Sequence, residues 1–255
     1  MTESEIITVP AVIGHRGAAG HAPENTLASL RKAAELGVRW VEFDTKLTRD
    51  GAAVLFHDHT LERTTDGRGE VAETALADLR ERDAGTWFDG AFAGERVPTL
   101  LDAMAALARL GLGAIVEIKP SPGRAAETGR VVAGVLKSSW PATLPAPLIS
   151  SFDREALAAA LDAAPNIHRA LNLLKIPWGW RKQVKALDCR AIHCLERKLT
   201  AKRVGAFKDE GLVVRAFTVN DRDRAETLFG WGVHGVISDY PERILASHPS
   251  RQPTG

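Results

Sequence analysis

The chain has 255 residues, of which 45% are hydrophobic and 25% are charged, so its composition is globular and excludes a disordered chain outside the two ends. This length suits one large domain. The 33 Lys and Arg residues against 32 Asp and Glu residues leave a formal net charge of +1, which does not indicate a nucleic-acid or membrane-surface partner.

Short apolar or β-branched runs recur along the chain and are separated by helix-forming sequence, as in a parallel sheet. The runs are residues 9–14, 39–44, 114–118, 148–151, 168–171, 191–194, 213–218 and 235–238. Helices are predicted over residues 24–36, 154–163 and 201–210. Eight such runs fit a closed barrel, so the predicted fold is a single α/β domain over residues 1–255, a (β/α)8 TIM barrel.

One interval, residues 52–98, breaks this rhythm between the second and third barrel strands. It carries a short strand over residues 53–56 and is then rich in Asp, Gly and Thr. A gap this long in a compact domain usually has its own structure and function. We interpret it as a small inserted subdomain that caps the barrel mouth.

Residues 1–10 contain Glu3 and Glu5 and lack the basic-then-apolar order of a signal peptide. No apolar run reaches the ~20 residues that cross a bilayer. We therefore expect a cytoplasmic protein with no stable membrane insertion. Residues 247–255 are expected to be a frayed tail.

In a β/α barrel the working groups lie at the carboxyl ends of the strands, and here those ends carry acidic side chains. Glu42 and Asp44 are two residues apart on one strand and therefore share a face. Buried together they would repel each other unless a cation compensates, and their hard oxygens suit Mg²⁺ or Ca²⁺. Alone, Glu42 could instead face a helix and pair with a Lys or Arg. A third carboxylate, Glu117, with Lys119 on the next strand, favours the metal site.

Two histidines, His15 and His57, each follow a strand and precede a charged residue, where an imidazole can exchange protons near neutral pH. Arg16 and Lys119 offer the donors that a phosphate needs. Cys189 and Cys194, with His193 between them, match no usual zinc pattern and are expected to pack in the core.

Several short segments, taken in order and spacing, resemble the glycerophosphodiester phosphodiesterase family of the bacterial cytoplasmic type. They are Gly-His-Arg-Gly (14–17), Pro-Glu-Asn-Thr (23–26), Glu-Phe-Asp (42–44), His-Asp (57–58), Arg-Thr-Thr (63–65), Pro-Thr-Leu (98–100), Glu-Ile-Lys (117–119), Ser-Ser-Phe (150–152), Thr-Val-Asn (218–220) and Gly-Val-His-Gly-Val-Ile-Ser-Asp-Tyr-Pro (232–241). The segments span most of the chain. Each tripeptide alone is a weak signal, but their joint order is specific.

The resemblance implies a function and a role for each predicted site residue. One divalent cation, Mg²⁺ or Ca²⁺, would be held by Glu42, Asp44 and Glu117. His15 and His57 would be general acid and base, and Arg16 and Lys119 would contact the phosphate. Glu24 and Asn25 would order the first loop and the surroundings of the metal.

The implied substrate is a glycerophosphodiester, such as glycerophosphocholine or glycerophosphoethanolamine, cleaved to sn-glycerol 3-phosphate and an alcohol. Which histidine is the acid stays open, as does whether water or the substrate's own hydroxyl attacks. Phe217 stands where a tryptophan often precedes Thr-Val-Asn, and His234 stands where Asp is usual. Phe217 is therefore a candidate wall of the alcohol pocket.

Two alternatives remain. One is a lysophospholipase D of the same family, in which aromatic residues near Trp178 and Trp180 hold an acyl chain; simple packing is the competing interpretation of these tryptophans. The other is a binding protein that keeps the barrel without catalysis. The presence of both histidines and all three carboxylates argues against it.

Overall fold

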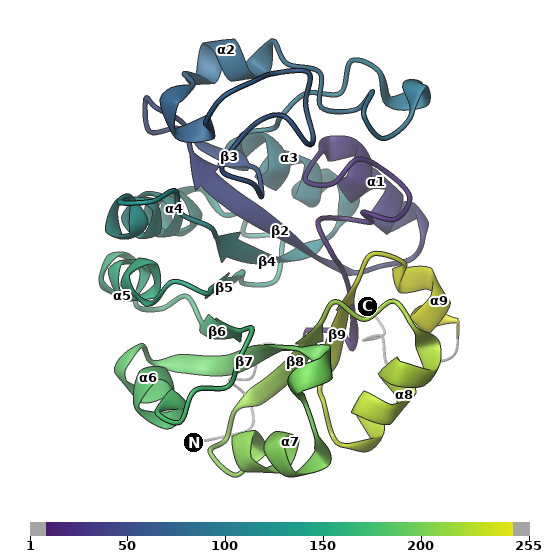
Figure 1. Ribbon diagram of the computed structural model, residues 1–255, viewed down its shortest axis with the longest axis vertical. Helices are drawn as coiled ribbons and strands as arrows, with labels where there is room; N and C mark the ends of the chain where they lie inside the picture. The colour runs from purple at the N-terminus through teal and green to yellow at the C-terminus, as the bar shows by residue number, and fades with distance from the viewer. Residues whose placement is uncertain (1–8, 247–255) are drawn as a thin grey trace.

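The computed structural model describes residues 9–246, and its centre is a closed barrel of parallel strands (Figure 1). β1 pairs with β2 on one side and with β9 on the other, which closes the sheet. The barrel strands are β1 (Val12–Gly14), β2 (Trp40–Leu47), β4 (Gly113–Ile118), β5 (Leu148–Ser151), β6 (Arg169–Leu173), β7 (Cys189–Leu195), β8 (Val213–Phe217) and β9 (Gly235–Ser238). The predicted eight-stranded barrel is confirmed.

Helices between the strands surround the barrel (Figure 1). They are α1 (Leu27–Glu35), α3 (Leu100–Leu110), α4 (Ala125–Ser139), α5 (Arg154–Ala163), α6 (Trp180–Ala186), α7 (Ala201–Lys208), α8 (Arg222–Gly230) and α9 (Pro241–Leu245). α3 begins at a capping box in which Thr99 and Asp102 satisfy each other's backbone N–H groups, and it ends at left-handed Gly111.

The predicted start of the first helix, at residue 24, is wrong. Asn25 has a φ of 58°, which no helix accommodates, and the Thr26 side chain accepts a hydrogen bond from the backbone N–H of Ser29 as an N-cap. The helix therefore begins at Leu27. Glu24 and Asn25 therefore lie in the loop that precedes the helix.

The interior of the barrel changes character along its axis. Apolar residues near the amino ends of the strands pack together as a plug: Ile13, Trp40, Ile115, Leu148, Ala170, Ala191 and Ile237. Two residues further along, on the same inward face, stand polar ones: Glu42, Glu117, Ser150, Asn172 and His193. The plug seals one end, and the polar layer faces the carboxyl ends.

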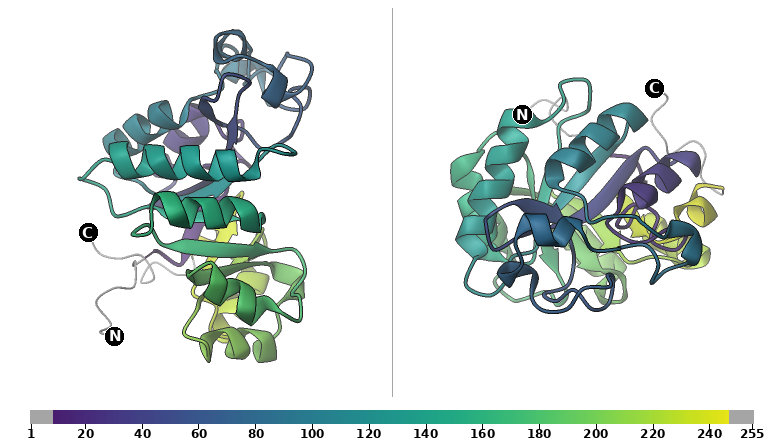
Figure 2. Two further views of the ribbon diagram at one scale, coloured as in Figure 1. Left: turned by 90° about the vertical axis from the view of Figure 1, so that its left-hand side faces the viewer. Right: turned by 90° about the horizontal axis from the view of Figure 1, so that it is seen from above.

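Residues 52–98 form a projection at one end of the molecule's long axis (Figure 2). They contain β3 (Ala53–Leu55), which pairs antiparallel with β2, the 3-10 helices η2 (Val71–Glu73) and η3 (Gly90–Phe92), and α2 (Leu76–Arg80). Their buried hydrophobic cluster is separate from that of the barrel and consists of Val54, Phe56, Leu61, Val71, Leu79, Ala84 and Val97.

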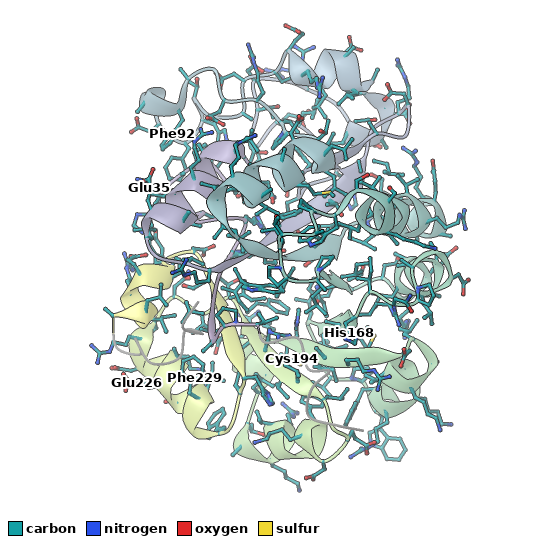
Figure 3. The ribbon with its side chains drawn as sticks, turned by 180° about the vertical axis from the view of Figure 1, so that it is seen from behind. Glu35, Phe92, His168, Cys194, Glu226 and Phe229 are labelled. Carbon is teal, nitrogen blue, oxygen red and sulfur yellow. The ribbon has the colours of Figure 1, made fainter. Side chains whose placement is uncertain are left out.

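The projection is tied to α1 by Glu95, which accepts hydrogen bonds from the Ala28 backbone N–H (3.3 Å) and from Arg31 (2.6 Å). Glu35 and Phe92 line a groove between these two elements and lie on the same side of the molecule (Figure 3). Within residues 9–246, no helix combines the length and the apolar character that a bilayer crossing requires.

Candidate active site

A cavity of about 440 Å³ opens at the carboxyl ends of the strands, where a β/α barrel places its functional groups. The structure brings seven of the predicted residues to its walls: His15, Arg16, Glu42, Asp44, His57, Glu117 and Lys119. His57 is the one wall residue, among those described, that comes from residues 52–98. Glu24 and Asn25 lie behind the wall and touch it through Arg16 and Asp44.

Three carboxylates meet in the polar layer of the barrel. Glu42, Asp44 and Glu117 are almost fully buried, and each can offer one oxygen so that the three oxygens lie within 4.8 Å of one another. Oxygens bound at 2.0–2.6 Å to one Mg²⁺ or Ca²⁺ have about this spacing. The donor set therefore fits a hard divalent cation.

The electrostatics of the cluster also favour a cation. Burial, and then repulsion by Asp44, raises the pKa of both Glu42 and Glu117. Burial acts in the same direction on Asp44, but the charges of Arg16, Lys119 and His57 outweigh it, so the pKa of Asp44 is lowered. Without further positive charge, the cluster thus resists full ionisation.

Two cations border the cluster. The Arg16 Nε lies 3.1 Å from Asp44 Oδ2, and the Lys119 Nζ lies 3.5 Å from Asp44 Oδ1 and 3.3 Å from Glu117 Oε1. Asn25 donates from its amide to Asp44 (3.0 Å) and accepts from the Asp44 backbone N–H (3.1 Å). Asn25 thereby fixes the rotamer of Asp44, and its left-handed backbone is part of that arrangement.

The turn after β1 explains why two glycines flank His15 and Arg16. A Cβ at Gly14 would stand 2.0 Å from the Gly17 carbonyl oxygen, and one at Gly17 would stand 2.3 Å from the Ser29 Oγ. Gly17 also has a φ of 88°, which side chains rarely adopt. The turn is tight enough for the Arg16 backbone N–H to donate to Glu42 Oε2 (3.1 Å).

Each histidine is held at Nδ1 by a carboxylate. His15 contacts Asp239 Oδ1 at 2.6 Å, and His57 contacts Asp58 Oδ1 at 2.5 Å. Because the partners are carboxylates, Nδ1 is the donor in both bonds, and Nε2 carries the lone pair in the neutral ring. Burial lowers the pKa of His57.

Arg63 connects the His57 side of the site to the first loop. It donates to Asp58 Oδ2 (2.5 Å) and to both oxygens of Glu24 (2.8 Å each). Glu24 in turn accepts from Arg16 (2.6 Å). His57 is therefore linked to Arg16 through ion pairs although residues 52–98 have a separate core.

Sequence reasoning missed three inward polar residues of the barrel. Asn172 donates to Glu117 Oε2 (2.9 Å), while its own Oδ1 is buried without a hydrogen-bond partner in the described chain. The fully buried Arg215 lies 3.4 Å from His193 Nε2 and forms no ion pair within residues 9–246. Burial lowers the pKa of Arg215 to about 10. Each of these polar residues stands two positions after an apolar residue at the amino end of its strand, and this spacing could have indicated from the sequence that they face the barrel interior.

The two departures from the family pattern have different positions. Phe217 lines the cavity and packs edge-on against Phe152, with ring centroids 5.6 Å apart. His234 lies outside the cavity walls, where its Nδ1 accepts a hydrogen bond from the Val214 backbone N–H (3.0 Å). Cys189 and Cys194 are free and buried.

The match to known proteins decides the family. The model of the glycerophosphoryl diester phosphodiesterase family matches residues 15–243. The chain belongs to this family. It is an enzyme, a phosphoric diester hydrolase of the glycerophosphodiester phosphodiesterase type.

Individual members of the glycerophosphodiester phosphodiesterase family resemble the chain over nearly its whole length. A glycerophosphodiester phosphodiesterase of Caldanaerobacter subterraneus is 31% identical, over 92% of this chain and 96% of the relative, and one of Bacillus subtilis is 29% identical, over 90% and 83%. The solved structure of an Oleispira antarctica phosphodiesterase, in complex with the product sn-glycerol-3-phosphate, is 42% identical. It covers 94% of this chain and 97% of its own, with a TM-score of 0.91.

Proposed function

We propose that the enzyme hydrolyses glycerophosphodiesters, such as glycerophosphocholine or glycerophosphoethanolamine, to sn-glycerol 3-phosphate and an alcohol, with a divalent cation and with His15 and His57 as the acid-base pair. The observation that carries the proposal is one cavity in which two Nδ1-anchored histidines accompany three buried carboxylates and two cations. The product in the Oleispira antarctica structure supports the substrate class.

Glu42, Asp44 and Glu117 would hold Mg²⁺ or Ca²⁺, which when bound polarises phosphoryl oxygens and offsets their developing charge. Arg16 and Lys119, at the edge of the same cluster, bind the phosphoryl oxygens that remain. Glu24 and Asn25 keep Arg16 and Asp44 in place through the contacts at 2.6 and 3.0 Å. These donors need little reorganisation during the reaction.

The histidines transfer protons through Nε2. The Nε2 of one takes a proton from the attacking oxygen as that oxygen forms its bond to phosphorus. The other gives a proton to the departing alcohol oxygen as its P–O bond breaks. Asp239 and Asp58 hold the two rings at Nδ1, which leaves each Nε2 for proton transfer. Each transfer contributes about 10² to 10⁴ in rate.

The test is an assay of several glycerophosphodiesters by the purified enzyme, with glycerol 3-phosphate as the measured product, before and after removal of bound metal. We expect release of glycerol 3-phosphate that chelation stops and Mg²⁺ or Ca²⁺ restores. Release of a different phosphorylated product would refute the substrate assignment. Unchanged turnover in metal-free enzyme would refute the metal.

A second candidate, lysophospholipase D activity, is favoured by one observation. The outer cavity wall is apolar, with Phe152, Leu174, Leu195 and Phe217. These side chains could contact the acyl chain of a lipid-like diester. Comparison of kcat/KM for lysophosphatidylcholine and glycerophosphocholine separates the two candidates.

A further inference from the structure

The loop between β6 and α6 exposes unusual apolar surface. Four large hydrophobic side chains are exposed in the described chain, and two of them, Leu174 and Trp178, lie in this loop. Trp178 is entirely in solvent, at 105% relative exposure. A fully exposed tryptophan on a globular domain indicates a surface that contacts a lipid bilayer or another molecule.

Packing of the neighbouring Trp180 anchors the loop and leaves the Trp178 side chain exposed to solvent. Two residues further on, Trp180 is buried, with its ring centroid 4.7 Å from that of Phe207 on α7. Arg181 lies over the Trp180 ring at 4.5 Å and pairs with Glu210 at 2.6 Å. The two tryptophans of the sequence thus have opposite roles: Trp180 packs, and Trp178 does not.

The sequence from the end of β6 to the start of α7 is rich in basic residues, although the whole chain is nearly neutral. Residues 174–203 contain nine Lys and Arg residues and two acidic ones, Asp188 and Glu196. Both acidic side chains are already paired: Asp188 with Arg169 and Arg190, and Glu196 with Arg224. Four of the basic residues follow the carboxyl ends of β6 and β7, at the mouth of the barrel, and form no ion pair within residues 9–246. They are Lys175, Lys182, Arg197 and Lys198.

These residues border the entrance to the cavity. β6 and β7 are neighbours with Leu173 paired to Cys194, so the loops that follow them leave the barrel side by side. Leu174, which follows β6, and Leu195, the last residue of β7, line the cavity. We call the surface formed by Leu174, Lys175, Trp178, Lys182, Arg197 and Lys198 the basic rim.

We propose that the basic rim docks the enzyme reversibly on an anionic phospholipid surface. An exposed tryptophan suits the headgroup region of a bilayer, and unpaired lysines and arginines are attracted to its negative surface potential. Since the rim includes Leu174 and adjoins Leu195, and both line the cavity, docking turns the cavity entrance toward the lipid. A single tryptophan with four basic residues gives a contact that salt weakens and that does not insert.

The experiment is co-sedimentation of the full chain with phosphatidylcholine vesicles that contain or lack phosphatidylglycerol. The parent should bind the anionic vesicles, with a blue shift of its tryptophan emission, and high salt should release it. Lys175→Glu/Lys182→Glu should weaken binding at least about tenfold. Trp178→Ala should weaken binding and remove the blue shift.

The matched control is Arg39→Glu/Arg109→Glu. Arg39 precedes β2 and Arg109 lies in the last turn of α3, at the amino-end face of the barrel, and both are exposed without an ion pair in the described chain. This control makes the same charge change away from the rim. It should bind the anionic vesicles as well as the parent does, and so at least about tenfold more tightly than the rim variant.

Equal binding to neutral and anionic vesicles, or equal loss in the rim variant and the control, would overturn the proposal. So would self-association through this face that Trp178→Ala abolishes, because the occupant would then be a second copy of the chain. Turnover of soluble glycerophosphocholine by each variant is measured in parallel. It should stay at the parent value, so failure to dock and failure of the proposed function give different results.

Discussion

At the residue scale, His15 and His57 share a hydrogen-bonding arrangement that favours a catalytic role over a packing role. Both rings bond a carboxylate through Nδ1 and line the cavity, and both side chains are partly exposed, His15 at 18% and His57 at 26%. Loss of a ring should therefore remove proton transfer while it leaves the core intact.

We predict that His15→Ala and His57→Ala each lower kcat at least about 10²-fold and leave the melting temperature nearly unchanged. The double variant should be little worse than the poorer single variant, because residues in one proton-transfer cycle are not additive. A nitrophenyl phosphodiester should partly rescue whichever variant lacks the general acid, since its departing oxygen needs no proton. Variants that melt far below the parent but keep its kcat would show that the histidines are structural.

Cys189 and Cys194 allow a prediction about thiol chemistry. Burial raises the pKa of each thiol to about 12. The thiolate is the reactive form, so at about pH 8 a raised pKa leaves almost none of it and the thiols should be inert. We expect no reaction of the native enzyme with a disulfide reagent within minutes, and reaction of two thiols per chain after unfolding. Rapid reaction of the folded protein with unchanged activity would contradict this.

The site residues that could be predicted from the sequence lie next to strand ends, where a short motif carries both position and chemistry. The partners of these residues could not be predicted. Asp239 stands 224 positions from His15, and Asn172 stands 55 positions from Glu117. No periodicity links such pairs, because barrel closure and strand order bring them together.

At the element scale, residues 52–98 combine a hydrophobic cluster of their own with ion pairs to the barrel site. We propose that they form an inserted capping subdomain in one domain with the barrel. His57 follows Phe56, which is a member of that cluster. The position of a candidate catalytic group therefore depends on packing in the insertion.

We predict different effects for two fully buried leucines, Leu79 in the insertion and Leu107 in the barrel core. Truncation of a buried leucine to alanine costs about 2–5 kcal/mol where the loss falls on the cooperative core. Leu107→Ala should lower the melting temperature of the whole protein. Leu79→Ala should instead increase proteolysis within residues 58–97 and lower kcat through His57, with less effect on global unfolding. Equal global destabilisation by both would refute a separable insertion.

The eight strands could be predicted because strands of a parallel barrel are buried on both faces and appear as continuous apolar runs. The ends of the helices were harder to predict than the positions of the strands. α7 ends at Lys208 rather than at the predicted residue 210, and the first helix begins three residues later than predicted because Asn25 serves the site instead of the helix. Helices α2, α3, α4, α6, α8 and α9 were not predicted individually. The seven-residue α6 has an exposed basic face and lacks a helical apolar stripe.

At the scale of the whole molecule, the near-neutral net charge conceals two local excesses of opposite sign. The three carboxylates form a negative centre inside the barrel, and the basic rim lies outside the cavity mouth. Composition could not reveal this separation, because it depends on which strands are neighbours.

The negative centre leads to a prediction about the stability of the entire fold. A cation that binds the native cluster and not the unfolded chain stabilises the protein by about 2.7 kcal/mol at a hundredfold excess over its Kd. For a chain of this size, that should raise the melting temperature by roughly 5–10 °C. The measurement is the melting temperature of the His15→Ala variant, first without metal and then after addition of Mg²⁺ or Ca²⁺. This variant keeps the three carboxylates, so it separates metal binding from turnover. Glu117→Gln in the same background is the matched control, because it removes one negative ligand at nearly constant volume and should lose most of the shift. In parallel, chelation should abolish turnover of the parent, and either ion should restore it. If the metal raises the melting temperature of Glu117→Gln as much as that of its background, the cation binds elsewhere and the carboxylate cluster is not its site.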